Sequence, residues 1–163
     1  MHDLGHPYVG FLYVGLMIVE GNPFVIEFNV RMGDPETQVV IPRIKSSLYE
    51  MFEGSINGRI DKIDINFSLD TFVTVVLASK GYPEKYKTGQ NISEIKPLKN
   101  NILFHAGTDF DGENYTVSGG RVLSAVGSGE SISKAIDNVY SFVEKIGFEE
   151  IYFRKDIGQK GLK

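Results

Sequence analysis

The stretch that decides the fold reads Val25-Ile26-Glu27-Phe28-Asn29-Val30-Arg31-Met32-Gly33-Asp34-Pro35-Glu36-Thr37. Side chains two residues apart on a β-strand share a face, so the alternation in its first half predicts a strand over residues 24–31. The opposite face carries a carboxylate, a carboxamide and a guanidinium in a row, from Glu27, Asn29 and Arg31. The first face is wholly apolar and consists of Phe24, Ile26, Phe28 and Val30.

The polar face of this strand has the chemistry of a metal and phosphate site. The carboxylate of Glu27 and the amide carbonyl of Asn29 are hard oxygen donors, which suit magnesium or manganese. Arg31 offers a planar fork of donors that fits phosphate or carboxylate. The alternative is a solvated strand face on which Glu27 and Arg31 are simply surface charges.

The residues after the strand, Gly33-Asp34-Pro35-Glu36, predict a sharp transition into a helix. Asp34 suits the N-cap, Pro35 the first helical position and Glu36 the first turn. Free backbone N–H groups at such a helix start also attract anions, although the two carboxylates would compete with one. These residues are therefore either helix caps or part of the same site.

Outward from this stretch, the chain has the pattern of an α+β protein in two parts, with a boundary in the polar residues 58–66. The first part, residues 1–58, has a hairpin whose first strand lies within 11–20, a helix over 34–41 and a second helix that starts at Ser47. The second part, residues 66–163, has a mostly antiparallel sheet and one long helix from Ser131 to Gly147. Its predicted strands span 71–78, 102–108, 115–118, 121–126 and 151–153. We expect the apolar hairpin face to pack on the helix from Ser47 and on the second part.

Composition excludes several functional classes. The chain has 163 residues with a net charge of -4, which argues against non-specific nucleic-acid binding. It has no cysteine, which excludes disulfides and thiolate chemistry and fits a reducing compartment. No apolar run approaches the roughly 20 residues of a membrane-spanning helix. We expect a cytoplasmic protein that binds neither nucleic acid nor membrane.

Several motifs together resemble phosphoribosylamine–glycine ligase, also called glycinamide ribonucleotide synthetase. Residues 27–29, 31–40 and 42–43 resemble the end of its ATP-grasp core. The Glu-x-Asn pair is shared across the ATP-grasp superfamily, whereas Gly33-Asp34-Pro35-Glu36-Thr37 is typical of this ligase. Further matches to its C-terminal domain are Lys80-Gly81-Tyr82-Pro83, Ser118-Gly119-Gly120-Arg121-Val122-Leu123 and Arg154-x-Asp156-Ile157-Gly158.

The resemblance implies an ATP-dependent C–N ligase of purine biosynthesis, with Mg²⁺ or Mn²⁺ as cofactor. Such an enzyme uses ATP to convert glycine to an acyl phosphate, which the amine of phosphoribosylamine then attacks to give glycinamide ribonucleotide. It implies that Glu27 and Asn29 hold the metal and that Arg31 is catalytic, neutralising phosphoryl charge. Asp34 and Glu36 would bind substrate or a metal-bound water.

The chain departs from this family because it contains no glycine-rich phosphate loop and none of the amino-terminal half. We therefore expect a carboxy-terminal fragment, inactive alone, whose partners are the missing half, ATP, glycine and phosphoribosylamine. One alternative is another ATP-grasp ligase or carboxylase, which residues 33–36 disfavour. The other is a non-catalytic binding or assembly module that completes a second chain.

Overall fold

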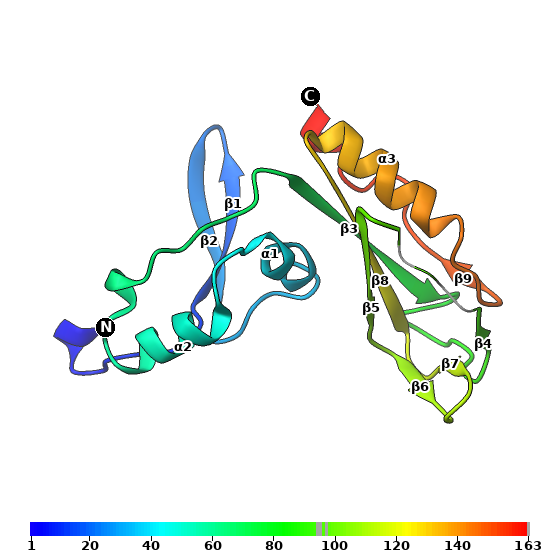
Figure 1. Ribbon diagram of the computed structural model, residues 1–163, viewed down its shortest axis with the longest axis horizontal. Helices are drawn as coiled ribbons and strands as arrows, with labels where there is room; N and C mark the ends of the chain where they lie inside the picture. Colours follow the sequence, from blue (N-terminus) through cyan, green and yellow to red (C-terminus); the bar gives the residue numbers. More distant parts are fainter. Residues whose placement is uncertain (94–95, 97, 163) are drawn as a thin grey trace. The chain divides into compact units, whose positions relative to one another are not determined.

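The computed structural model describes residues 1–93, 96 and 98–162, and the chain divides into two compact units. The amino-terminal unit is residues 1–68 and the carboxy-terminal unit is residues 69–163. The mixture of helices and antiparallel strands along the chain confirms the α+β prediction (Figure 1). In the part of the chain that the structure describes, no helix is both long and apolar enough to cross a bilayer.

The carboxy-terminal unit is built on an antiparallel sheet with strand order β5-β8-β3-β9. One helix, α3, packs against this sheet (Figure 1). A second antiparallel sheet has the order β4-β7-β6. The elements are β3 (Thr71–Ser79), β4 (Asn91–Ile92), β5 (Asn101–His105), β6 (Thr108–Phe110), β7 (Tyr115–Val117), β8 (Arg121–Gly129), α3 (Ile132–Val143) and β9 (Ile151–Tyr152), followed by a 3-10 turn (Gln159–Leu162).

Helix α3 begins where its sequence predicts, because a cap and an apolar stripe agree, but it ends at Val143 and not at Gly147. The Oγ of Ser131 accepts a hydrogen bond from the Lys134 N–H at 3.2 Å, which satisfies one free donor of the first turn. The buried residues of the helix recur at helical spacing and face the sheet. They are Ala135, Ile136, Val139, Phe142 and Val143.

The backbone of helix α3 packs closely against the backbone of β8 at Gly127. A Cβ at this position would overlap the Val139 nitrogen and lie 2.7 Å from the Ala135 carbonyl oxygen. A side chain here would push the helix off the sheet, so the glycine sets how closely the two elements pack.

The predicted strand over residues 102–108 is two strands, β5 and β6, in different sheets. The N–H groups of Ala106 and Gly107 still donate to the carbonyls of Val122 and Arg121, at 3.0 and 2.8 Å. The Gly107 carbonyl then accepts from Ser118 N–H at 2.8 Å, and the chain turns toward β7. A Cβ on Gly107 would lie 2.6 Å from Cα of Gly119. The backbones at these two glycines can therefore pack closely because neither residue has a side chain.

The amino-terminal unit contains a two-stranded hairpin and two helices. They are β1 (Tyr13–Val19), β2 (Asn22–Asn29), α1 (Thr37–Arg43) and α2 (Leu48–Ile56), with 3-10 turns at His2–Leu4 and Ile60–Lys62. The Ser47 Oγ accepts from the Glu50 N–H at 3.3 Å, so the predicted cap of α2 is confirmed. The β2 strand ends two residues earlier than predicted, and residues 30 and 31 form a bend.

Helix α1 differs from its prediction at both ends. It starts at Thr37 rather than Asp34, because the N–H groups of Gln38 and Val39 bond to carbonyls only three residues back, at 3.2 and 3.1 Å, so residues 34–36 form turns. Pro42 lies inside its last turn instead of ending it. The helix nevertheless stops one residue later, at Arg43.

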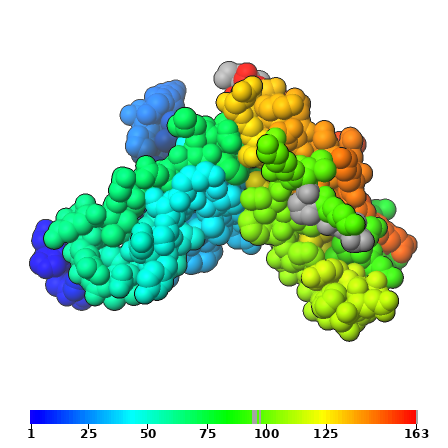
Figure 2. Space-filling view, viewed as in Figure 1, coloured from blue at the N-terminus to red at the C-terminus, as the bar shows by residue number. Residues whose placement is uncertain are grey.

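Helix α2 does not cover the apolar face of the hairpin, contrary to the prediction. Within residues 1–68 the hairpin of β1 and β2 extends away from the two helices (Figure 1), and Figure 2 shows part of its surface in blue. The side chains of its predicted apolar face are each more than half exposed, so α2 does not bury them. Their exposed fractions are 57% for Phe24, 63% for Ile26, 64% for Phe28 and 72% for Val30.

Candidate functional site

Glu27 and Asn29 lie on one face of the hairpin, near the end of β2. Glu27 pairs with Gly15 and Asn29 pairs with Tyr13 across the antiparallel ladder. The pairing is regular between these two positions, so both side chains project to the same side. Glu27 is exposed and Asn29 is half-buried, which leaves a carboxylate and an amide oxygen open to a ligand from solvent.

A β-bulge lies immediately before Glu27. Gly15 pairs with Glu27 and Leu16 pairs with Val25, so Ile26 has no partner on β1. Bulges of this kind twist the strand and redirect the neighbouring side chain. The predicted alternation is therefore interrupted at Ile26, and the polar face consists of the residues that follow the bulge.

Arg31 lies beyond the strand, in the bend that follows β2. Its side chain is exposed, and its Nη1 donates to the Met32 carbonyl at 3.0 Å. Because the strand has ended, the alternation rule no longer fixes the direction of this side chain relative to Glu27 and Asn29. The guanidinium keeps further donors with which to bind an anion.

The turn after the bend brings Glu36 back over Gly33. Gly33 is buried, and its Cα lies directly beneath the Glu36 carboxylate. Thr37 holds the turn, since its Oγ1 and its N–H both donate to the Gly33 carbonyl, at 2.5 and 2.9 Å. Asp34 is exposed in the same turn. Sequence reasoning assigned no role to the Thr37 hydroxyl, although a threonine four residues after a glycine carbonyl can make this bond.

The donor set fits a magnesium-type ion better than a metal held by many side chains. Among the described residues, no group of three or more histidine, cysteine or acidic side chains is placed to hold a metal ion. Magnesium usually takes one or two carboxylate or carbonyl ligands and completes its shell with water and phosphate oxygens. An exposed carboxylate beside a half-buried amide oxygen supplies two such ligands and leaves the other positions of the ion to water and phosphate.

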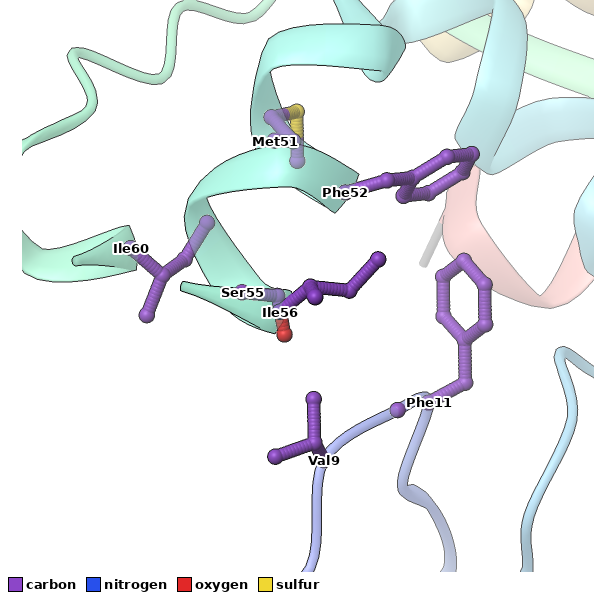
Figure 3. Close-up of a pocket in the computed structure, with 8 residues that line it drawn as sticks. Val9, Phe11, Met51, Phe52, Ser55, Ile56 and Ile60 are labelled. Carbon is purple, nitrogen blue, oxygen red and sulfur yellow. The ribbon is translucent and has the colours of Figure 1, made fainter. Parts of the chain in front are cut away.

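The amino-terminal unit also has an open apolar groove between residues 9–11 and α2 (Figure 3). Its volume is about 460 Å³. The rings of Phe11 and Phe52 meet edge to face, with centroids 5.7 Å apart. Ile56 is 74% exposed, so this side of α2 lines an open groove and is not buried in a core.

Comparisons with known proteins identify both units. A sequence model of the phosphoribosylglycinamide synthetase C domain matches residues 72–160, more than half of the chain. A model of the ATP-grasp (A) domain of the same synthetase matches residues 1–37. The phosphoribosylamine–glycine ligase of Chlorobaculum tepidum is 47% identical over 162 residues, which are 97% of this chain and 38% of that protein.

Solved structures agree with these matches. The phosphoribosylamine–glycine ligase from Thermotoga maritima has a TM-score of 0.80 and 33% identity, over 95% of this chain and 38% of that one. The biotin carboxylase domain of 2-oxoglutarate carboxylase from Hydrogenobacter thermophilus has a TM-score of 0.59. It is 15% identical, over 86% of this chain and 32% of that one, and so shows a shared fold alone. The chain spans 38% of the length of each of the two ligases that it matches.

Proposed function

The chain belongs to the phosphoribosylglycinamide synthetase family, and from this membership we propose that it is the carboxy-terminal part of an ATP-dependent ligase. The ligase would join phosphoribosylamine to glycine and yield glycinamide ribonucleotide in purine biosynthesis. The observation that carries the proposal is that two domains of one synthetase match in order along the chain. A cytoplasmic location is part of it, since a chain without cysteine has no disulfide to form.

In this proposal Glu27 and Asn29 hold a Mg²⁺ or Mn²⁺ ion. Their common strand face and the exposure of the Glu27 side chain support that role. When bound, the ion would supply positive charge to the ATP phosphates during phosphoryl transfer. Glu27 contributes a full negative charge to the ion and Asn29 a neutral oxygen, so Glu27→Gln is expected to weaken the site most directly.

Arg31 is proposed to neutralise charge on the transferred phosphoryl group. Its exposure and its position two residues past Asn29 support this assignment. Asp34 and Glu36 are proposed to bind substrate or a metal-bound water. The turn that places Glu36 is fixed by two hydrogen bonds onto Gly33, so this carboxylate has a defined position near the end of β2.

We also propose that the rest of the ligase, whether joined to this chain or separate, covers the exposed apolar surface of the amino-terminal unit. The hairpin strands, residues 9–11 and helix α2 carry large apolar side chains that are mostly exposed. Exposed apolar patches of this kind are typical of interfaces. Such a cover would also explain why the apolar face of β2 exists.

A chimera tests the proposal. This chain replaces the matching 38% of the Chlorobaculum tepidum ligase, and ADP release is measured with ATP, Mg²⁺, glycine and freshly made phosphoribosylamine. We expect activity that requires both substrates, and none from the 163-residue chain alone. Replacing a residue that supports a metal ligand typically lowers metal affinity or activity about 10–100-fold. Replacing a ligand itself should cost at least as much, so Glu27→Gln and Asn29→Ala should each lower turnover about 100-fold or more at limiting Mg²⁺. Arg31→Lys should also lower turnover, because lysine lacks the bidentate fork.

Glu20→Gln is the matched control, because it removes a carboxylate from the hairpin turn and leaves the polar face intact. If Glu27→Gln and Glu20→Gln turn over alike at limiting Mg²⁺, the metal assignment is wrong. Turnover by the 163-residue chain alone would show instead that the chain needs no other part of the ligase.

Two other functions remain distinguishable. The exposed groove and hairpin favour a non-catalytic assembly module, which would restore the chimera even when Glu27, Asn29 and Arg31 are all replaced. A different ATP-grasp activity would release ADP with another acceptor, such as bicarbonate, and not with glycine. The same chimera assay therefore distinguishes the proposed ligase activity from these two alternatives.

A further inference from the structure

Glycines are the only buried residues of the amino-terminal unit, all of whose 68 residues the structure describes. They are Gly15, Gly33 and Gly54. None of the three has a backbone conformation in the left-handed region, so an L-residue could adopt each backbone without strain. Glycine at these positions is therefore explained by space and not by conformation.

At Gly15 the space is filled by Glu27. A Cβ built on Gly15 would lie 3.0 Å from the Glu27 Cγ and 3.7 Å from the Glu27 backbone nitrogen and oxygen. The stem of the Glu27 side chain thus leans across the opposite strand, over a position with no side chain. The bulge at Ile26 ends beside this pair, so the bulge and the glycine act on the same side chain.

At Gly33 the space is filled by Glu36. A Cβ there would overlap the Glu36 Oε2, and would lie 3.0 Å from Cδ and 3.3 Å from Cβ of the same side chain. The turn cannot easily open to relieve this contact, because Thr37 binds the Gly33 carbonyl through two hydrogen bonds. At Gly54, by contrast, the filling group is the aliphatic side chain of Ile63.

We propose that Gly15 and Gly33 are positioning residues, each leaving the space in which one carboxylate of the site lies. Gly15 sets the direction of Glu27, and Gly33 sets that of Glu36. What the two carboxylates do rests on the function proposed above, but their placement by the glycines does not. A single added methyl group at either position should therefore move a carboxylate without unfolding the chain.

The test uses the whole 163-residue chain, side-chain carboxyl NMR signals and Mn²⁺ alone as the probe. Gly15→Ala should shift the Glu27 carboxyl signal. It should also raise about 10-fold the Mn²⁺ concentration that is needed to broaden the signals of Glu27 and Asn29, because loss of a group that supports a metal ligand typically weakens metal binding by this much. Gly33→Ala should shift the Glu36 carboxyl signal and leave Mn²⁺ broadening at Glu27 unchanged. The control is Gly147→Ala, a glycine of ordinary conformation whose nearest neighbour is the Ser93 Oγ at 3.6 Å.

A double-mutant cycle separates positioning from a general effect on the hairpin. In a Glu27→Ala background the side chain that fills the space over Gly15 is gone, so Gly15→Ala should perturb the amide signals of β1 and β2 less than it does in the unsubstituted background. Equal perturbation in both backgrounds would overturn the proposal, and so would a Glu27 carboxyl signal that Gly15→Ala leaves in place. If Mn²⁺ fails to broaden Glu27 in the unsubstituted chain, the metal function fails, while the carboxyl shifts and the cycle still decide the positioning.

Discussion

The two units of this chain use apolar residues in opposite ways. Every buried hydrophobic side chain in the described residues lies between Val73 and Phe148, in the carboxy-terminal unit. The amino-terminal unit buries only three glycines, while its large apolar side chains stay largely exposed. The carboxy-terminal unit therefore closes a core of its own, and the amino-terminal unit has local structure without a side-chain core.

This difference has a thermodynamic consequence. Burial of apolar area is the dominant favourable term in folding, and an isolated two-stranded hairpin is marginal in water. The hairpin of β1 and β2 gains ladder hydrogen bonds but little burial, whereas α3 and its sheet gain both. The stability of the whole chain should thus reside in the carboxy-terminal unit.

Hydrogen exchange should reveal the largest difference. Amides of β3, β8 and α3 should exchange only by global unfolding, whose free energy is on the order of 5–15 kcal/mol for a small domain. Amides of β1 and β2 should exchange by local opening at a free energy near zero. Slow exchange throughout residues 13–29 in a demonstrated monomer, matching the slowest amides of β8, would show that the hairpin belongs to one common core.

A pair of phenylalanine substitutions tests the same comparison with a smaller effect. Phe142 is fully buried under the sheet and Phe28 is 64% exposed on the hairpin. Phe142→Ala should lower the free energy of unfolding by about 3–5 kcal/mol, because it removes buried area and leaves a cavity. Phe28→Ala should change it by no more than about 0.5 kcal/mol. Urea unfolding followed by circular dichroism measures both, and equal losses would contradict the division into a core and an uncovered unit.

What could be predicted from sequence follows the same division. The start of helix α3 at the Ser131 cap and the strand over residues 71–78 are confirmed, because local propensity and burial agree there. The predicted end of the helix at Gly147 is wrong, since the helix ends at Val143. In the amino-terminal unit the alternation of residues 24–31 predicted the strand, but not its bulge at Ile26 or its end at Asn29. A bulge depends on the pairing with β1, which a pattern along one strand does not contain.

The candidate site shows a second limit. The motif identified Glu27, Asn29, Arg31, Asp34 and Glu36 by type and spacing, and their roles stay predictions. The spacing could not show that Glu27 faces Gly15 or that Glu36 folds over Gly33, because those contacts arise from a cross-strand register and from a turn held by Thr37. The cap predicted at Asp34 is wrong, because residues 34–36 form turns and the helix begins after Glu36, which makes no side-chain cap hydrogen bond.

The serine N-caps of α3 and α2 allow one substitution to be compared in the two units, with a smaller expected effect than that of Phe142→Ala. Ser131 and Ser47 each accept a hydrogen bond from the N–H three residues on, at 3.2 and 3.3 Å. Loss of such a cap typically costs about 1 kcal/mol of helix stability. Ser131→Ala should therefore shift the urea midpoint of the carboxy-terminal unit, whereas Ser47→Ala should only lower the helicity of α2, seen in its 13Cα shifts. A shift of the same unfolding midpoint by Ser47→Ala would mean that the two units unfold together.

The smallest expected effect is a pH dependence at the end of the carboxy-terminal unit. Arg154 binds Asp156 through two hydrogen bonds, from Nε at 2.9 Å and from Nη2 at 2.6 Å. This bidentate contact lowers the pKa of Asp156 below its ordinary value of 3.8. The same segment is tied to α3, since Tyr140 Oη donates to the Arg154 carbonyl at 2.8 Å and accepts from the Ile157 N–H at 3.1 Å.

Because the folded-state pKa of Asp156 lies below that of the unfolded chain, its contribution is present above the unfolded value. That contribution is lost as pH falls through the lower folded value. Carboxyl NMR should show a titration midpoint below 3.8, and Asp156→Asn should flatten the loss of stability on acidification. The effect should be small and weakened by salt, because both side chains are 62% exposed.

Glu53→Gln is the comparison in the amino-terminal unit, where Arg59 makes a single contact to Glu53 at 3.7 Å. If the carboxy-terminal unit unfolds alone, that substitution should leave its acid transition unchanged, and a shift as large as that of Asp156→Asn would show that the two units share one equilibrium.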